Sequence, residues 1–366
     1  MSRKLFANVC VMGALLLYGM SSYAELSDNA KVFATGFNNP RGLKFAPFAF
    51  RLFVAEAGLG GTHSTNGLCA QVPPPLGPFT GGNTGSITVV GPEGNKSTLM
   101  DGLPSSQTQF LDIQGPTDIE FVGLQLYVLV QAGCAKGDPA FPNAVVKLRG
   151  KKLKLVADLS AYIQNHPQNF PPDDDEDPEG NPYAFTVHNE QALVVIEANR
   201  GTVEKVHRNG TITRLADLTA FIQGYDTPVA IDIDGDGNVY VGSFSAVPFV
   251  PGTSTVYKIT PQGVISVFAQ GFTTVIDIAF DDAGVLYVLE TSAGFLPLPR
   301  DTGRVIKLID GSVEVIATGL DLPTAMTFGP DGALYVSNRG HGVGLTPGQG
   351  EIVRINVHAA TDSLQP

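Results

Sequence analysis

The sequence has no tryptophan, only three cysteines and few charged residues. Charged side chains make up 16% of the 366 residues, against roughly 25% in an ordinary globular domain. Acidic residues outnumber basic ones by 35 to 23, and the net charge is −12. A chain this acidic is repelled by nucleic acid and by anionic membrane surfaces, which excludes both as expected partners. The sequence also lacks a Ser-centred nucleophile elbow, a Cys-rich zinc pattern and a phosphate-binding loop.

Long hydrophobic runs are missing too, since the longest one is short of the roughly 20 residues that a membrane span needs. This run, from about Leu5 to Tyr18, follows the basic pair Arg3 and Lys4 and precedes small residues that end at Ala24. The pattern predicts that residues 1–24 are a removable secretory signal peptide. A membrane anchor is the alternative. Cleavage would leave an exported chain, periplasmic or extracellular, without a stable membrane span.

Glycine, proline and apolar residues are abundant instead. There are 42 Gly and 26 Pro, and 43% of the residues are hydrophobic. A chain of this length and composition can bury a large core, so wholesale disorder is excluded. The many turn-forming residues indicate short elements joined by many turns.

One sequence motif, which predicts two consecutive strands, is repeated six times along the chain. Its first part is an apolar and small strand, and its second part is a strand of the Leu-Tyr-Val type, with a turn between them. The first strands are 40–45, 116–121, 182–187, 228–233, 275–280 and 323–328, and the second strands begin at 52, 126, 193, 239, 286 and 334. Each pair is followed by a third strand and usually by a fourth.

The spacing of these repeats predicts a six-bladed β-propeller of four-stranded antiparallel blades, formed by residues 25–366 as one domain. Successive repeats begin 76, 66, 46, 47 and 48 residues apart, and four strands per forty-odd residues is typical of propeller blades. A two-sheet sandwich would not explain the sixfold similarity. The last repeat stops after its third strand, 352–355, whereas the mature chain begins with an orphan strand, 32–37. Pairing these two ends would close the ring.

Alternation along the innermost strands predicts which side chains line the central channel. In each six-residue innermost strand, the third and fifth residues are small or polar, whereas the fourth and sixth are apolar. Asp118 and Asp277 occupy the same register in blades 2 and 5, on opposite sides of the ring. They could share a divalent cation such as Ca²⁺, a water cluster or a ligand. The alternative is that both are hydrated channel residues with no ligand.

The long connections all fall on one face of the predicted ring, which is typical of a binding or catalytic face. In an antiparallel meander the connections alternate between the two ends, and the short hairpin turns share the opposite end. The long loops cover roughly residues 57–83, 100–115, 131–143, 158–181, 243–253, 291–302 and 339–349. His166 and His341 lie in such loops, without metal-ligand spacing.

The second strands end on this face with a set of polar residues. Three glutamates form an acidic rim that could bind a cation or act in acid–base chemistry, and nearby arginines could pair with them. Salt bridges or backbone caps are the structural alternative. The channel-mouth candidates are Arg41, Glu56, Asp118, Glu197, Asp277, Glu290, Asn338 and Arg339, with Arg300 as a further possible partner of the rim.

Cys69 and Cys134 lie in equivalent loops of blades 1 and 2. In an exported protein they are expected to form a disulfide. Two separate thiols, or a catalytic pair of a cysteine with His63, are the alternatives.

Two acidic motifs have ordinary explanations. The segment 232–237 resembles the start of a calcium loop, but Ser243 stands where a bidentate Glu is needed, which favours a hairpin turn. The run from Asp173 to Asp177 is expected to be a solvated loop segment that could collect calcium weakly.

Several phrases resemble the ScyD/ScyE family over nearly the whole mature chain. They are Asn39-Pro-Arg-Gly-Leu43, Phe53-Val-Ala-Glu-Ala-Gly58, Gly115-Pro-Thr-Asp-Ile119, Asn181-Pro-Tyr183, 271–277 and 331–339. The resemblance implies an exported, NHL-like six-bladed propeller, a type of protein sometimes encoded beside genes for the pigment scytonemin, with no established reaction. More distantly the layout is similar to gluconolactonase-type propellers, which bind a metal through Glu, Asn and Asp around the channel. Here the corresponding positions carry Arg41, Thr117, Tyr183 and Thr324.

Three hypotheses about function follow. The leading one is a binding or accessory propeller that holds a small molecule or a protein on its long-loop face. The second is a metal-dependent hydrolase or lactonase that uses Asp118, Asp277 and the acidic rim. The third is a protein-interaction scaffold that uses the outer blade surfaces.

Overall fold

A computed structural model describes residues 25–169, 177–222, 226–309, 311–341 and 347–358. The predicted signal peptide, residues 1–24, lies outside the described residues, as does most of the acidic run that begins at Asp173. Within the described residues no helix is long and apolar enough to cross a membrane.

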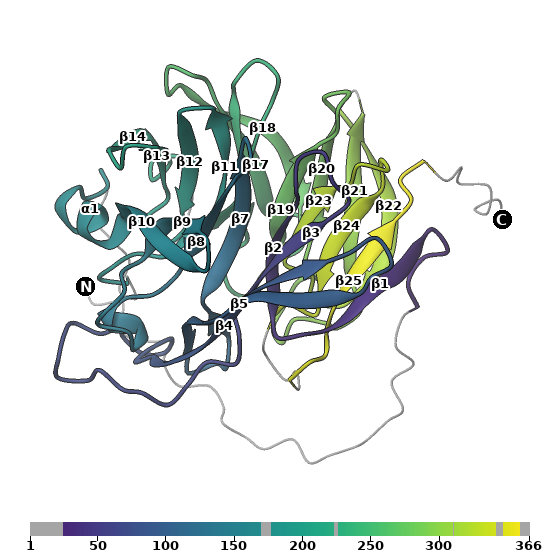
Figure 1. The fold of residues 1–366 in the computed structure, drawn as a ribbon. Coiled ribbons are helices and arrows are strands. Elements are labelled where there is room, and N and C mark those ends of the chain that lie inside the picture. Colours follow the sequence, from purple (N-terminus) through teal and green to yellow (C-terminus); the bar gives the residue numbers. More distant parts are fainter. Residues whose placement is uncertain (1–24, 170–176, 223–225, 310, 342–346, 359–366) are drawn as a thin grey trace, which may run out of the picture.

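Six antiparallel sheets form the blades of a β-propeller, as the repeats predicted (Figure 1). Blade 1 contains β2 (Pro40–Phe45), β3 (Leu52–Glu56), β4 (Thr80–Val90), β5 (Lys96–Gln107) and β6 (Ile113–Gln114). Blade 2 contains β7 (Pro116–Val122), β8 (Gln125–Val130), β9 (Ala144–Arg149) and β10 (Lys152–Asp158). Blade 3 contains β11 (Pro182–Asn189), β12 (Ala192–Glu197), β13 (Thr202–His207) and β14 (Ile212–Asp217).

The remaining blades repeat this order. Blade 4 contains β15 (Thr227–Ile233), β16 (Val239–Phe244), β17 (Ser254–Ile259) and β18 (Ile265–Phe272). Blade 5 contains β19 (Val275–Phe280), β20 (Leu286–Glu290), β21 (Gly303–Ile309) and β22 (Ser312–Leu320). Blade 6 contains β23 (Ala325–Phe328), β24 (Leu334–Asn338), β25 (Gly350–Ile355) and β1 (Ala30–Phe37).

The two ends of the chain close the ring, which confirms the predicted pairing. Strand β1 is the outer strand of blade 6 and runs antiparallel to β25, with Ala30 opposite Ile355 and Val32 opposite Val353. The last blade therefore cannot be completed without the N-terminal strand. This closure covers a sheet edge that would otherwise be free to pair with another chain.

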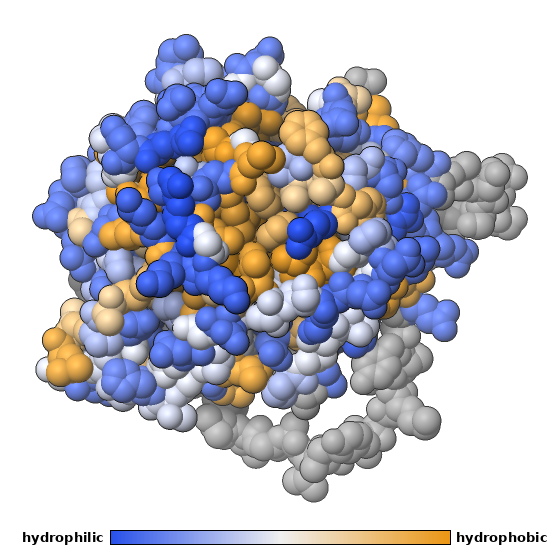
Figure 2. All heavy atoms as spheres, viewed as in Figure 1, coloured by the Kyte–Doolittle hydropathy of each residue, from blue (hydrophilic) through white to orange (hydrophobic). Residues whose placement is uncertain are grey.

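The hydrophobic core lies between neighbouring blades. One cluster joins Leu43 and Val54 of blade 1 to Tyr335 and Ile352 of blade 6, and all four side chains are at most 3% exposed. This packing follows from the two-residue period of the strands, which gives each blade an apolar face toward its neighbour. On the face seen in Figure 2, hydrophobic residues gather over the inner strands, with hydrophilic residues around them.

Two parts of the expected long loops are regular structure. Strand β5 continues to Gln107 and pairs with the short β6, so blade 1 has five strands where four were expected. Helix α1 (Leu159–Asn165) begins in the loop after β10, because the Asp158 side chain accepts the backbone N–H of Ala161 as an N-cap. The helix packs onto the ring, since its buried residues Leu159 and Ile163 belong to the hydrophobic cluster that joins blades 2 and 3.

Candidate functional site

The innermost strands place polar side chains in the central channel, as alternation predicted. The open space is about 170 Å³, and its charged lining comes from Lys44, Asp118, Glu120, Asp232 and Asp277. The Lys44 ammonium donates a hydrogen bond of 2.8 Å to Glu120. Among the described residues, the channel therefore holds four carboxylates and one ammonium.

Asp118 and Asp277 join neighbouring blades. One oxygen of Asp118 accepts the backbone N–H of Ile119, and the other accepts that of Phe185 in blade 3 at 2.9 Å. Asp277 repeats the arrangement with the N–H groups of Ile278 and, in blade 6 at 2.7 Å, Met326. The sequence placed both residues correctly in the channel, but it did not show that each links its blade to the next.

The electrostatics of this cluster oppose ionisation. The pKa of Asp118 is raised to about 7, chiefly by burial and also by the neighbouring Glu120, although the Phe185 and Ile119 amides and Lys44 act in the other direction. Burial also raises the pKa of Asp277 well above its usual value, and the charges of Asp118 and Asp232 add to this effect. The carboxylates are thus coupled to one another across the channel.

The channel carboxylates do not fit the metal centre that a resemblance to lactonases implies. Among the described residues no group of three or more His, Cys, Asp or Glu side chains could hold a metal ion. Both oxygens of Asp118 and of Asp277 already accept backbone N–H groups. A divalent ion with six or more oxygen ligands needs a larger convergent set.

The three rim glutamates are buried, and each accepts a backbone N–H from the segment just before the innermost strand of its blade. Glu56 accepts the N–H of Asn38, Glu197 accepts that of Asn181, and Glu290 accepts that of Thr273 at 2.7 Å. Their exposed fractions are 4%, 0% and 1%. This arrangement matches the structural alternative, a backbone cap that recurs because the blades recur.

Asn338 is the equivalent residue of blade 6 and accepts the N–H of Asp321 at 2.8 Å. The expected pairing of the rim with Arg41, Arg300 and Arg339 is wrong. Arg300 and Arg339 pair with Asp321, and Arg41 pairs with Asp112. The Glu290 carboxylate pairs instead with Arg304, which lies beside it on β21.

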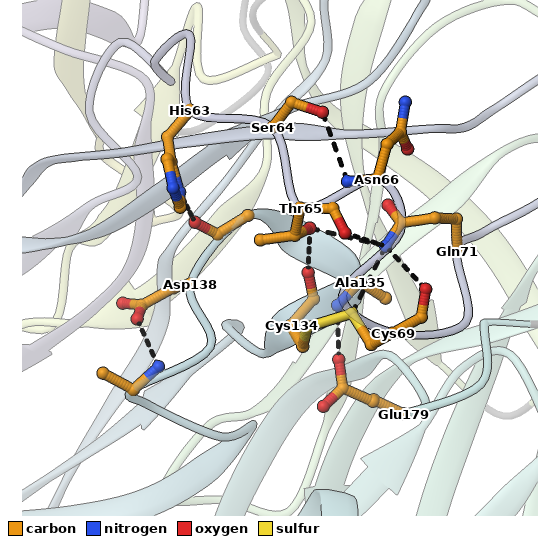
Figure 3. Close-up of a disulfide and its surroundings, with 12 residues drawn as sticks. His63, Ser64, Thr65, Asn66, Cys69, Gln71, Cys134, Ala135, Asp138 and Glu179 are labelled. Carbon is orange, nitrogen blue, oxygen red and sulfur yellow. Dashed lines mark hydrogen bonds between the residues drawn. A yellow bond between two sulfur atoms is a disulfide. The ribbon is translucent and has the colours of Figure 1, made fainter.

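Cys69 and Cys134 form a disulfide, which confirms the prediction and removes both thiol alternatives (Figure 3). His63 belongs to the same junction, where a ring nitrogen lies 2.7 Å from the carbonyl oxygen of Gly137. The disulfide therefore ties the long loop after β3 to the loop after β8.

The two acidic motifs are resolved differently. Asp234 accepts the N–H groups of Asp236 and Asn238 in the turn before β16, which confirms the hairpin. Asp177, the described end of the acidic run, is buried at 4% exposure and pairs with Lys136, so the expectation of solvation is wrong for this residue. A buried ammonium in the adjacent blade holds it, which the local sequence could not show.

The long-loop face contains a larger cavity of about 670 Å³, which we call the mouth pocket. Its walls are mostly apolar and come from loops or strand ends of blades 1, 3, 4, 5 and 6. The lining includes Pro75, Leu76, Phe110, Asp112, Tyr183, Val229, Phe244, Val247, Phe249, Ile276, Leu296 and His341. Phe110, Val247 and Leu296 are each more than half exposed at its rim.

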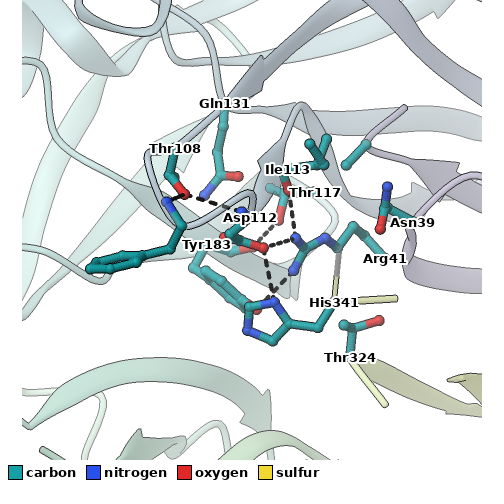
Figure 4. Close-up of polar contacts among 12 residues, drawn as sticks. Asn39, Arg41, Thr108, Asp112, Ile113, Thr117, Gln131, Tyr183, Thr324 and His341 are labelled. Atoms are coloured by element: carbon teal, nitrogen blue, oxygen red, sulfur yellow. Dashed lines mark hydrogen bonds and ion pairs between the residues drawn. The ribbon is translucent and has the colours of Figure 1, made fainter. Parts of the chain in front are cut away.

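Four polar side chains meet at one end of the mouth pocket (Figure 4). Arg41 is 5% exposed and donates to Asp112 at 3.0 Å, to the carbonyl of Ile113 at 2.5 Å and to the Tyr183 hydroxyl at 3.3 Å. Nδ1 of His341 lies 2.9 Å from the same Asp112 oxygen. We call Arg41, Asp112, Tyr183 and His341 the polar cluster.

Charges within the polar cluster keep Asp112 ionised. Burial alone would raise its pKa, but His341 and Arg41, through their charges and hydrogen bonds, together hold the pKa well below the usual range. Of the cluster, Arg41 was a predicted site residue, whereas Asp112, Tyr183 and His341 were not. They come from three different blades, and no local motif connects them.

The comparisons with known proteins support the fold alone. No family model matches the chain, and no curated protein sequence matches it. A gluconolactonase from Xanthomonas campestris is 10% identical with a TM-score of 0.54, covering 89% of each chain. The aldose sugar dehydrogenase of Escherichia coli is 13% identical with a TM-score of 0.54, covering 91% of this chain and 99% of its own. Regucalcin from Agrobacterium tumefaciens is 14% identical with a TM-score of 0.52, covering 89% and 92%. The chain is therefore a six-bladed β-propeller with lactonase-like and sugar-dehydrogenase-like structural neighbours.

Proposed function

We propose that this protein is an exported binding propeller that holds a small, largely apolar ligand in the mouth pocket. The single observation that carries the proposal is the pocket itself, with apolar walls from five blades and one polar end. Concave sites of this size with a few converging polar groups are typical of small-molecule binding. The disulfide is consistent with export to an oxidising compartment.

The resemblance to the ScyD/ScyE family supports the same conclusion, because that family consists of exported propellers with no established reaction. A binding or accessory role needs no metal centre, which agrees with the donor set in the described part of the channel. The ligand expected from the lining has an apolar body and one polar group that reaches the polar cluster.

Binding of 8-anilinonaphthalene-1-sulfonate, a fluorescent probe with an apolar body and one anionic group, tests the proposal. The native protein should bind it at one saturable site, and Phe110→Asp should weaken binding roughly tenfold or more, because it places a second carboxylate at the rim. Leu124→Asp is the matched control, since Leu124 is 79% exposed in the turn between β7 and β8. Equal binding by both variants would contradict the proposal.

The metal-dependent hydrolase is tested by a separate measurement. Elemental analysis of protein purified without chelator should find no stoichiometric divalent ion if the mouth pocket is a metal-independent binding site. A bound ion that is lost in Asp118→Ala or Asp277→Ala would favour the hydrolase instead.

A further inference from the structure

The two ring nitrogens of His341 face different surroundings. Nδ1 lies 2.9 Å from the Asp112 carboxylate, and Figure 4 shows the other nitrogen on the opposite side of the ring. Because an ionised carboxylate only accepts hydrogen bonds, Asp112 favours the tautomer that carries its proton on Nδ1. Nε2 then keeps a free lone pair, and His341 lines the mouth pocket.

Asp112 is held firmly enough to orient this ring. Arg41 donates to the same oxygen at 3.0 Å, and the Asp112 backbone N–H donates to the Thr108 hydroxyl at 3.1 Å. Arg41 is itself fixed by the carbonyl of Ile113. A histidine oriented by a fixed carboxylate is the arrangement that general bases use.

Tyr183 supplies a hydrogen-bond donor beside this base. Its hydroxyl accepts from Arg41 at 3.3 Å, so its own O–H remains for another acceptor, and Tyr183 also lines the mouth pocket. Burial raises the pKa of Tyr183, although the Arg41 charge opposes this, so the phenol keeps its proton at neutral pH. A base and a donor therefore face one apolar cavity.

We propose that His341 is a general base that removes a proton from an apolar substrate in the mouth pocket, while Tyr183 donates a hydrogen bond to the atom that gains negative charge. This inference rests on the proposed ligand site and adds an activity to it. The substrate class is a compact, mostly apolar molecule with one acidic C–H or O–H group. His341 takes up the proton, and the electron pair left behind moves onto the atom that Tyr183 contacts.

The ring opening of 5-nitrobenzisoxazole tests this activity because it needs only a base in an apolar site. The base removes the proton on C3, the C–H electron pair forms the nitrile, and the N–O bond breaks. The oxygen leaves as a coloured phenolate, so no other reactant is consumed. The native protein should accelerate the reaction above the rate given by free imidazole at the same concentration.

His341→Ala should reduce the rate roughly a hundredfold, since a positioned base contributes about 10²–10⁴-fold. His358→Ala is the matched control, because His358 is exposed and lies outside the pocket. Asp112→Asn should lower kcat for the benzisoxazole while leaving KM nearly unchanged, which a purely structural role for Asp112 would not do. Thermal unfolding checks that each variant is folded.

The outcomes separate this inference from the proposed function. Saturable binding of the fluorescent probe with no rate above free imidazole would leave the binding site standing and overturn the general base. Equal rates for His341→Ala and the native protein would also overturn it. If neither the probe nor the benzisoxazole interacts with the pocket, the proposed function fails as well.

Discussion

The central channel and the mouth pocket both present charged side chains to an open space, but they use them differently. In the channel, Asp118 and Asp277 direct both carboxylate oxygens at backbone N–H groups, one of which belongs to the next blade. In the mouth pocket, Asp112 and Arg41 bind each other and leave His341 and Tyr183 facing the cavity. The channel carboxylates Asp118 and Asp277 thus hold the ring together, whereas Tyr183 on β11 and His341 from a loop remain available to a ligand.

The largest expected loss of stability comes from removing the disulfide, which links two loops on the long-loop face. Replacing Cys69 and Cys134 with serine should reduce the free energy of unfolding by about 2–4 kcal/mol, because a link across 65 residues restricts the unfolded chain. Urea unfolding measures this change. Probe binding should weaken too, since the linked loop supplies Pro75 and Leu76 to the mouth pocket. Native protein treated with reductant should behave like the variant, and unchanged stability in both would contradict the bracing role.

Removal of a channel carboxylate should lower the free energy of unfolding but leave ligand binding in the mouth pocket unchanged. Asp277→Ala leaves the buried N–H of Met326 without its acceptor, which should lower the free energy of unfolding by about 1–3 kcal/mol. Asp236→Ala, which removes an exposed carboxylate from a turn, is the control. If Asp277→Ala weakens binding of the fluorescent probe while the fold persists, the separation between the two regions is wrong.

The channel residue Asp118 should also make the free energy of unfolding depend on pH. The pKa of Asp118 is about 7 in the fold, against 3.8 for an ordinary Asp, so the folded state binds more protons than the unfolded state between these values. Its contribution is therefore present near pH 4 and is lost as the pH rises toward 7, with a slope of at most about 1.4 kcal/mol per pH unit.

Unfolding midpoints measured from pH 4 to 7 test this dependence. Asp118→Asn should flatten the slope, because the amide does not titrate. Asp236→Asn should leave it unchanged. A slope that is the same in all three proteins would show that Asp118 titrates with an ordinary pKa.

The smallest effect on stability should come from His341, at the polar end of the mouth pocket. His341→Ala removes a partly exposed ring, and the free energy of unfolding should change by no more than about 0.5 kcal/mol. Thermal unfolding measures it. A loss as large as that of Asp277→Ala would show that the polar cluster is structural, like the channel.

The sequence predicted the blades of the propeller well because the strands of each blade follow a repeated pattern. Alternation placed Asp118 and Asp277 in the channel, and the loop lengths placed the elaborated face correctly. The added strand β6 and helix α1 were not predicted, because each occurs in one blade and so has no repeated pattern. The buried pair of Lys136 and Asp177 was missed for a related reason, since its partners are 41 residues apart in different blades.

By itself, the sequence determined six blades, the closure of the ring by its own ends, the polar lining of the channel and the pairing of Cys69 with Cys134. These features follow from the two-residue period of strands and from a repeated phrase, both of which are local. Only the tertiary structure decided what the polar residues contact. The rim glutamates are buried and cap backbone N–H groups. The polar cluster lies at one end of the mouth pocket and comprises Arg41, Asp112, Tyr183 and His341. The contact between Asp112 and His341 joins residues 229 positions apart, and the geometry of the closed ring brings them together.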